Sequence, residues 1–246
     1  MIVSSDENGW KIINQRSHGL LAAMIGFQYD IDLPTNIKVP TLIAIAEHDD
    51  GVWESKQAEN LTGAGAPKDF RVQDHNTTTD LTRLYNVMEI SSAKSQLNAL
   101  LTSIHLDFLY KNRKKGEDKN LDNFLKEQQK HRKNILKNLS IDKKHSEQLY
   151  RLLEWCDAFS LLICLDKIQP EGRKMEISEN PDGEMNQTFF GHNKEIKVEP
   201  WVFKEDKFSV FYEYKILEQL KFKSTKEFDK VYLEALVQRE EFIISK

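Results

Sequence analysis

The sequence predicts a mainly α protein with a small carboxy-terminal α+β segment. Apolar residues recur at helical spacing through most of residues 14–168, whereas the apolar–polar alternation typical of strands becomes frequent only after residue 169. A strand-like segment at residues 9–13 precedes the helices. We therefore expect a helical core at 14–168 and an α+β subdomain at 169–246 that pairs with residues 1–13, either as a separate unit or integrated into one domain.

Composition and charge narrow the class of protein. The chain has 246 residues, of which 39% are hydrophobic and 30% are charged, which is enough for a sizeable core. The longest apolar stretches fall short of the roughly 20 residues that cross a bilayer. The amino terminus lacks the basic and apolar regions of a signal peptide. We expect a cytoplasmic protein with no membrane partner.

Residues 111–147 are basic within a chain of net charge -4, with about twice as many Lys and Arg as Asp and Glu. Few aromatic residues interrupt this run, so it is more typical of a solvated face than of a nucleic-acid interface, and nucleic-acid binding is not expected. Cys156 and Cys164 lie too far apart along one predicted helix to pair with each other. We expect buried, reduced thiols at both positions.

One histidine lies near the beginning of the first predicted helix, and another follows the end of the second. After the strand at 9–13, a helix over about 17–27 places His18 on the stripe that continues through Leu21, Ala22 and Ile25. A second helix, from Pro40 in its first turn to residue 47, leads directly into His48. The spacing therefore predicts that both imidazoles face the core.

The later helices carry two more chemically useful groups. Helices over about 80–110, broken near 91–92, place His105 on one face with Leu101 and Phe108. A central helix over 142–168 has Asp157 in an otherwise apolar stretch. An unpaired buried carboxylate costs several kcal/mol, so Asp157 is expected to be protonated, hydrogen-bonded, ion-paired or metal-bound. For Asp157 alone, an ion pair or a helix-cap contact fits as well as metal binding.

The sequence predicts several strands and one helix in the carboxy-terminal part. Alternation predicts strands, and Ser224 with Glu227 forms a capping box that begins an amphipathic helix. The expected strands lie at residues 196–198, 201–203, 208–214 and 242–244, with a turn at 180–183. We expect this segment to recruit the strand at 9–13.

The tetrapeptide His48-Asp49-Asp50-Gly51 is the strongest chemical signal. An adjacent His-Asp pair offers two ligands for a divalent metal from consecutive residues, and Gly51 allows the chain to turn sharply after them. The motif points to a metal-dependent hydrolase without naming a substrate. If His18, His105 and Asp157 converge on this pair, they form one site.

These residues resemble a known superfamily. His18, then His48-Asp49-x-Gly51 and a distant Asp157 look like the HD-domain metal-dependent phosphohydrolases. More closely, the chain resembles the uncharacterised bacterial family DUF3891 over nearly its whole length. The segments that carry this closer resemblance are Gly9-Trp10, Gln15-x-x-His18, Glu47 to Gly51, Trp53-Glu54, Ser103-x-His105 and Phe242-Ile243-Ile244.

The superfamily resemblance implies an HD-domain-like, all-α core that holds one or two divalent metals and hydrolyses a phosphoester. It implies metal ligation by four residues: His18, His48, Asp49 and Asp157. His105 would be a ligand of a second metal or a phosphate contact, and Asp50 or Glu54 would orient water or a ligand histidine. Such a donor set suits Mn²⁺, Fe²⁺, Ni²⁺ or Zn²⁺ better than Mg²⁺.

The expected function is hydrolysis of a phosphorylated small molecule, such as a nucleotide, with metal-activated water as the nucleophile. Whether the protein is an enzyme stays open at this stage. It could instead be a non-catalytic regulatory protein that binds metal or ligand, or a structural helical module in which His48 and Asp49 are an ordinary hydrogen-bonded pair. Candidates for a phosphate-binding cation, by sequence proximity alone, are Lys11, Arg16, Lys56 and Arg83.

Overall fold

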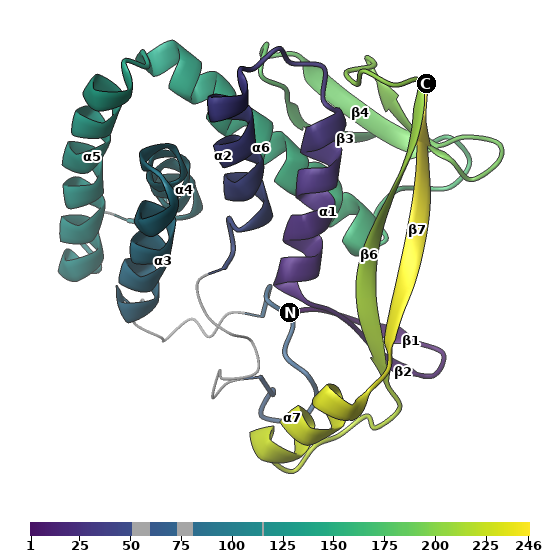
Figure 1. Cartoon of the computed structure of the whole chain (residues 1–246). Coiled ribbons are helices and arrows are strands. Elements are labelled where there is room, and N and C mark those ends of the chain that lie inside the picture. The colour runs from purple at the N-terminus through teal and green to yellow at the C-terminus, as the bar shows by residue number, and fades with distance from the viewer. Residues whose placement is uncertain (51–59, 73–80, 115) are drawn as a thin grey trace.

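The computed structural model describes residues 1–50, 60–72, 81–114 and 116–246. Most of the helices precede most of the strands in the chain. Figure 1 shows the helices within residues 15–164 beside a curled sheet and the last helix at the lower end of that sheet. The helices are α1 (Gln15–Gln28), α2 (Thr35–Ala46), α3 (Leu81–Lys94), α4 (Gln96–Leu109), α5 (Lys119–Leu139), α6 (Lys143–Cys164) and α7 (Thr225–Glu234). The strands are β1 (Ile2–Asp6), β2 (Gly9–Ile13), β3 (Met175–Glu179), β4 (Met185–Phe190), β5 (Ile196–Glu199), β6 (Lys207–Leu217) and β7 (Val237–Ser245).

The strands form a single sheet of seven in the order β1-β2-β6-β7-β5-β4-β3. Neighbouring strands are antiparallel except β5 and β7, which are parallel. The amino-terminal hairpin joins the carboxy-terminal strands because β2 pairs with β6, with Trp10 opposite Leu217 and Ile13 opposite Tyr214. Long β6 and β7 pair along nine residues and form the middle of the sheet.

The predicted mainly α fold with an all-α, HD-domain-like core was wrong. The structure is a mixed α/β fold, because the seven-stranded sheet contributes to the main hydrophobic core rather than forming a small appendage. Side chains of β2, β6 and β7, such as Ile13, Val210 and Ile244, are buried in the same cluster as Leu21 and Trp155 of the helices. The expected pairing of the amino-terminal strand with the carboxy-terminal segment is present as β2–β6.

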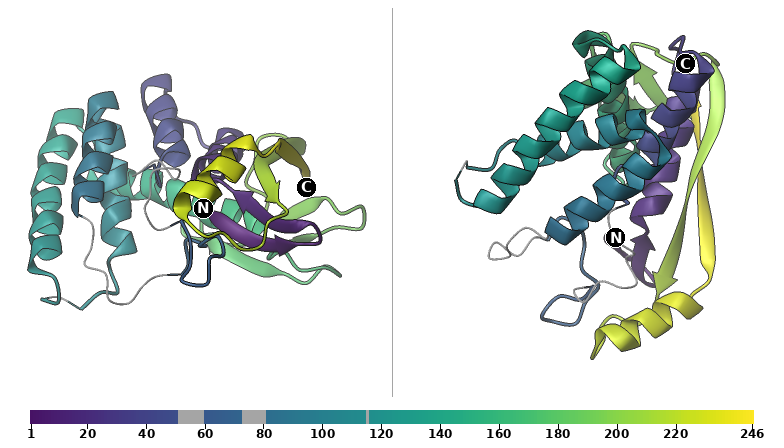
Figure 2. Two further views of the ribbon diagram at one scale, coloured as in Figure 1. Left: turned by 90° about the horizontal axis from the view of Figure 1, so that it is seen from below. Right: turned by 60° about the vertical axis from the view of Figure 1, so that its left-hand side comes forward.

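Four helices pack closely between the sheet and the outer helices. Helix α1 contacts α2, α6 and β6, and α4 contacts α2 and α6. On the side away from the sheet, α3 and α5 pack against α4 around a second cluster that contains Met88, Leu106 and Phe124. Figure 2 shows α3, α4 and α5 projecting away from the strands in both views. Helix α4 is therefore shared by both packing regions.

Local features depart from the sequence expectations at three places. Pro40 lies inside α2 rather than in its first turn, because the helix already begins at Thr35; the Pro40 carbonyl accepts a hydrogen bond from Asn98 Nδ2 at 3.0 Å. The break between α3 and α4 falls at Ser95, whose hydroxyl caps α4 by accepting from the Asn98 amide. Residues 201–203 form no strand; Phe203 makes only an isolated bridge with Tyr29.

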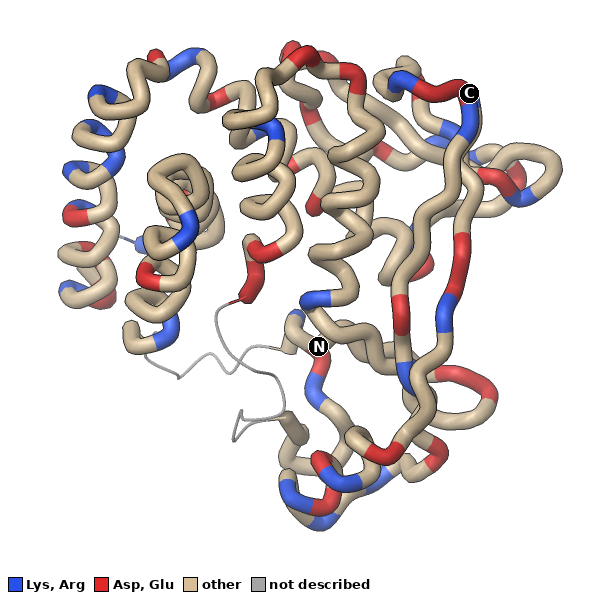
Figure 3. The backbone as a smooth tube through the Cα atoms, in the orientation of Figure 1, with Lys and Arg blue, Asp and Glu red and all other residues tan. Residues whose placement is uncertain are grey.

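The basic segment is largely helical. Helix α5 begins after Asp118, which caps it by accepting from the amides of Asn120 and Leu121. Figure 3 shows residues of both charge signs along this helix. Both cysteines are buried and free, as predicted. Within the described ranges, no helix combines the length and apolar character that a membrane crossing needs.

Candidate metal centre

Three histidines and two aspartates meet where α1, α2, α4 and α6 pack together. His18 lies in the first turn of α1, His48 and Asp49 follow the end of α2, His105 lies in α4, and Asp157 lies in α6. The three imidazoles are almost completely buried. Asp49 and Asp157 keep 24% and 16% of their side chains exposed, so the cluster opens to solvent at its carboxylates.

A close approach of two helices brings His18 and His48 together. A Cβ atom on Gly19 would lie only 2.1 Å from the carbonyl oxygen of Ala46, so the backbones of α1 and α2 touch at this point. The neighbouring rings of His18 and His48 are consequently edge to face, with centroids 5.2 Å apart. Gly19 therefore controls the spacing of the site, although the sequence alone gave no sign of this role.

The orientation of His48 is set by its own helix. His48 Nδ1 lies 2.7 Å from the carbonyl oxygen of Ile45, and because a carbonyl can only accept, Nδ1 carries the hydrogen. His48 Nε2 then faces Asp157 Oδ1 at 3.3 Å and Asp49 Oδ2 at 3.6 Å. A backbone carbonyl that fixes one ring nitrogen in this way is the usual support of a metal-binding histidine.

His18 and Asp157 form the second contact of the centre. His18 Nε2 lies 3.3 Å from Asp157 Oδ1, the same oxygen that faces His48. Despite this short distance, among the described residues neither ring nitrogen of His18 has a hydrogen-bond partner. One carboxylate oxygen is thus shared by two imidazoles without a satisfactory hydrogen bond to either.

His105 completes the group and also lies against the ring of His48. Its ring centroid lies 5.2 Å from that of His48, and its Nδ1 lies 3.4 Å from the hydroxyl of Tyr150. Its Nε2 is buried and makes no hydrogen bond within the part of the chain that the structure describes. Tyr150 was not identified from the sequence, since a tyrosine in an apolar helix carries no signal that separates a supporting role from packing.

Unsatisfied polar atoms converge on one small region. Nε2 of His18, His48 and His105 and Oδ1 of Asp157 are all buried without a hydrogen bond to the described residues. Buried polar atoms are nearly always satisfied, and each orphan costs about 1–3 kcal/mol. Donor atoms of His18, His48 and Asp49 lie within 4.8 Å of one another, as do those of His48, His105 and Asp157. The arrangement fits a divalent transition metal, which would satisfy these atoms together.

The electrostatics of the cluster point the same way. Burial lowers the pKa of His48, but the nearby carboxylates of Asp157 and Asp49 outweigh it and raise this pKa to about 10. Burial and a charged His48 lower the pKa of His105 to about 4. Burial raises the pKa of Asp157, yet His48 and His18 hold it well below its ordinary value. Two carboxylates among three imidazoles thus demand positive charge, which either a proton on His48 or a divalent cation supplies.

Polar neighbours hold the carboxylates at the mouth of the site. Gln15 Nε2 donates to Asp49 Oδ2 at 3.1 Å, which orients that carboxylate from the first turn of α1. Asp50 lies 3.3 Å from Arg16 Nε, and Glu47 pairs with Lys94 at 2.8 Å. Burial raises the pKa of Asp50 despite Arg16 nearby. Figure 3 shows acidic residues gathered at the end of α2 that leads into this region.

The structure places the other candidate residues that were identified from the sequence in different parts of the protein. Arg16 lies at the mouth of the site, beside Asp50. Lys11 does not serve there, because its ammonium is held on the sheet by Tyr212 at 2.8 Å and Glu240 at 2.5 Å. Arg83 lies in α3. Gly51, Glu54 and Lys56 fall in residues 51–59, outside the described residues.

The fold and the site together define a mixed α/β protein with a buried His-Asp cluster in its helical layer. The family described as a protein of unknown function, DUF3891, matches residues 1–219, and the chain belongs to this family. No curated protein and no solved structure matches the chain. The comparisons do not show the HD-domain resemblance.

Proposed function

We propose that this protein is a divalent-metal-dependent hydrolase that acts on a phosphorylated small molecule such as a nucleotide. The observation that carries the proposal is the convergence of three imidazole Nε2 atoms and one carboxylate oxygen, all buried and unsatisfied among the described residues. Three neutral imidazoles with two carboxylates form a donor set for Mn²⁺, Fe²⁺, Ni²⁺ or Zn²⁺. His18, His48, Asp49 and Asp157 would hold the metal, and His105 would hold the same ion or a substrate oxygen.

When bound, such a metal lowers the pKa of water and neutralises charge on a phosphoryl group. The chain's own residues supply the rest of the proposed chemistry. The exposed edges of Asp49 and Asp157 mark the side from which substrate reaches the centre. Arg16, exposed over 37% of its side chain, lies there to contact a phosphoryl oxygen, and Asp50 lies beside it to accept a proton from the attacking water.

Tyr150 and Gln15 have positioning roles in this proposal. Tyr150 fixes the ring of His105 through Nδ1, and Gln15 holds one oxygen of Asp49. Burial raises the pKa of the Tyr150 phenol, so the hydroxyl stays protonated at neutral pH and keeps this contact. Gln15 lies on α1 with His18, and Tyr150 lies on α6 with Asp157, so each supporting group comes from a helix that also carries a residue of the cluster.

The first test is metal content. Protein purified without chelator or a histidine tag would be measured by elemental analysis as wild type, His48→Gln and Asp157→Asn, with His145→Gln as the control, since His145 is exposed in the first turn of α6. We expect near-stoichiometric transition metal in the wild type and the control and its loss in both site variants. Folded wild-type protein without metal, and unable to take up any of the four metals, would contradict the proposal.

The second test is turnover. Metal-loaded protein would be assayed against p-nitrophenyl phosphate, bis-p-nitrophenyl phosphate and a panel of nucleotides, with Arg16→Gln and Asp50→Asn as variants. The proposal expects phosphate release that needs metal and that falls in both variants while metal content is unchanged. Metal binding without turnover of any phosphoester would favour the non-catalytic regulatory alternative, in which the centre holds a phosphorylated ligand.

A further inference from the structure

Strand β7 has a free edge along most of its length. On one side it pairs with β6 from Val237 to Ser245. On the other side, among the described residues, β5 pairs with it only at Ile244, which lies opposite Ile196. Figure 1 shows β6 and β7 as a long ribbon that runs from the strands at the top of the sheet down to α7. The edge formed by residues 237–243 is therefore open to a further strand, and such edges are ready templates for pairing.

The register shows which backbone groups face outward on this edge. The Lys246 amide donates to the Asp206 carbonyl oxygen at 2.9 Å, which continues the β6–β7 ladder by one hydrogen-bonded pair. Hydrogen-bonded and non-hydrogen-bonded pairs alternate in an antiparallel ladder, so the even-numbered residues of both strands bond to each other. Glu213 of β6 agrees with this pattern, because its amide donates to Ser17 Oγ at 2.7 Å. The odd-numbered residues of 237–243 therefore turn their amides and carbonyls away from β6.

These odd-numbered residues are complementary to themselves. Their side chains are exposed and share one face of the sheet: Val237, Arg239, Glu241 and Ile243. In an antiparallel pair of two such strands centred on Glu240, Arg239 faces Glu241 of the second copy, and Val237 faces Ile243. Each contact occurs twice, because the pair has two-fold symmetry. A shift of the register by two residues would instead place Glu241 opposite Glu241 or Arg239 opposite Arg239.

The charges on the edge suit this register. Glu241 makes no ion pair with the residues that the structure describes, and Arg239 pairs with Glu213 at 2.8 Å while about half of its side chain stays exposed. A guanidinium has five N–H donors, so Arg239 can also bind Glu241 of a second copy. The two Glu240 residues would lie opposite each other, but each is held by Lys11 of its own chain at 2.5 Å, which offsets their repulsion.

A cavity beside the upper end of β7 offers a further contact. It has a volume of about 280 Å³ and lies between Phe242 and Ile243 of β7 and residues 193–195, which connect β4 to β5. At the opposite end of the edge, Leu236 is exposed over 84% and Val237 over 58%. The two-fold pairing brings these two side chains of the second copy alongside Ile243, at this cavity. The same contact therefore covers apolar surface on both copies.

We propose that two copies of this chain pair through β7, antiparallel and centred on Glu240, so that their sheets join into one, with Leu236 and Val237 of each copy covering the cavity of the other. Residues 237–243 contain no proline or lysine, two residues with which exposed edge strands commonly avoid such pairing. The pairing does not depend on the proposed function, because β7 carries none of the histidine-cluster residues.

The test is sedimentation velocity of the full chain from about 5 to 200 µM, the range in which a small interface dissociates. We expect the wild type to form a dimer as its concentration rises. Glu241→Arg places two arginines opposite each other and should weaken the dimer at least about tenfold. Combining it with Arg239→Glu restores opposite charges in this register, but not in a register shifted by two residues. The double variant should return the affinity to within about threefold of the wild type.

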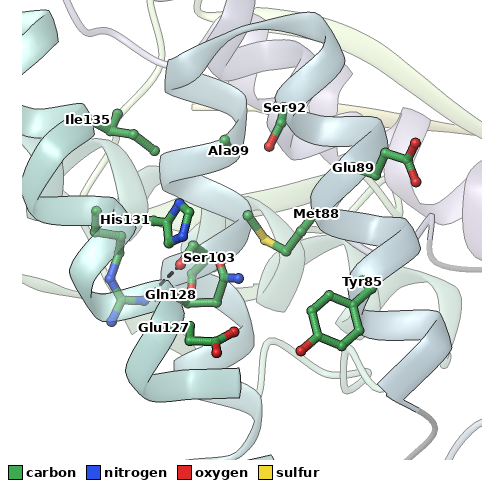
Figure 4. Close-up of a pocket in the computed structure, with 11 residues that line it drawn as sticks. Tyr85, Met88, Glu89, Ser92, Ala99, Ser103, Glu127, Gln128, His131 and Ile135 are labelled. Carbon is green, nitrogen blue, oxygen red and sulfur yellow. Dashed lines mark hydrogen bonds between the residues drawn. The ribbon is translucent and has the colours of Figure 1, made fainter. Parts of the chain in front are cut away.

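Glu89→Arg is the matched control, because it makes the same change of charge at an exposed residue of α3, on the side of the helices away from the sheet. Figure 4 shows the Glu89 carboxylate pointing away from the neighbouring side chains. This variant should dimerise as the wild type does. Leu236→Ser changes a side chain that is exposed in the single chain, so it should weaken the dimer at least about threefold without lowering the stability of the monomer.

Circular dichroism would confirm that each variant folds. A wild type that stays monomeric over the whole range would overturn the proposal and leave the edge of β7 to an extended segment of another protein. A dimer that Glu241→Arg or Leu236→Ser leaves unchanged, or that the double variant fails to restore, would overturn it as well.

Discussion

His48 and Asp157, which are distant in sequence, meet at 3.3 Å between the end of α2 and the middle of α6, with His48 buried and Asp157 partly exposed. Their contact is the centre of the cluster, because Asp157 Oδ1 also faces His18 and His48 also faces Asp49. In metal-free protein, a proton on His48 balances the carboxylates. A metal ion and that proton therefore compete for the same nitrogen.

The first prediction follows from this contact. Asp157→Asn removes the carboxylate charge that contributes most to raising the pKa of His48. The pKa of His48 in chelator-treated protein should therefore fall from about 10 toward or below its ordinary value. NMR titration of the imidazole would measure the change. The variant should also lose about 2 kcal/mol of stability in urea unfolding, less than a fully broken buried pair because His48 can become neutral. An unchanged His48 pKa would show that Asp157 does not control it.

The second prediction concerns Gly19. Gly19→Ala places a Cβ 2.1 Å from the Ala46 carbonyl oxygen, so α1 and α2 must separate. We expect a loss of about 1–3 kcal/mol in stability from this overpacking and a clear fall in metal affinity, since His18 and His48 flank the contact. Gly63→Ala is the matched control, because a Cβ there meets nothing within 4 Å. Equal behaviour of the two variants would contradict the role given to Gly19.

The third prediction tests the support of His105. Tyr150→Phe removes only the hydroxyl that lies 3.4 Å from His105 Nδ1. Loss of such an orienting group typically costs about 10- to 100-fold in metal affinity or activity. Tyr214→Phe, on the sheet, should leave metal affinity unchanged. A competitive chelator titration would compare both variants with wild type, and retention of full affinity by Tyr150→Phe would remove Tyr150 from the site.

The fourth prediction concerns pH and a different carboxylate. Burial alone would raise the pKa of Asp69, but hydrogen bonds from the Arg71 side chain, Val3 and the Arg71 amide outweigh it and lower this pKa. A group with a lowered folded-state pKa stabilises the fold above its unfolded pKa, about 3.9, and this stability is lost as pH falls through the folded-state pKa. Asp69→Asn should therefore cost about 1–2 kcal/mol at pH 7, and the difference from wild type should shrink on acidification below about pH 4.

Urea unfolding of both proteins at pH 7, 4 and 3 would check this prediction. Asp69 accepts a hydrogen bond from the Val3 amide, so it anchors the edge strand β1 to residues 60–72. Asp6→Asn is a suitable control because Asp6 lies in the same strand, where, among the described residues, its carboxylate accepts only from the nearby Asn8. A difference between wild type and Asp69→Asn that does not change with pH would contradict the assigned cause.

Helical periodicity was a sound guide to the burial of His18 and His105, because a repeat near 3.6 residues specifies which face of a helix packs inward. The isolation of Asp157 in an apolar helix likewise indicated a group with a specific partner. These signals depend on residues that are close in the sequence, so each holds regardless of how the rest of the chain folds. The ligand roles of these residues remain predictions.

The sheet was underestimated because several of its strands lack the local signal. Strand β3, with the sequence MEISE, buries no residue fully, and β1 has buried positions only at its start. Their pairing is decided by distant partners such as β2 and β4, which sequence patterns do not reveal. The Gly19–Ala46 contact and the Arg16–Asp50 pair were missed for the same reason, since both depend on how α1 meets the end of α2.

The position of β2 beside β6 has a consequence for biosynthesis. During translation, Trp10 to Ile13 leave the ribosome long before their partners Tyr214 to Leu217 are made. All the helices that carry the histidine cluster emerge in the interval, so they can collapse together while the sheet is still open. The sheet-facing side of α1 stays uncovered in the nascent chain until β6 is made, and it must not aggregate in that time. Because the pairing of β2 with β6 joins residues far apart in the sequence, we expect this step to set the rate of folding.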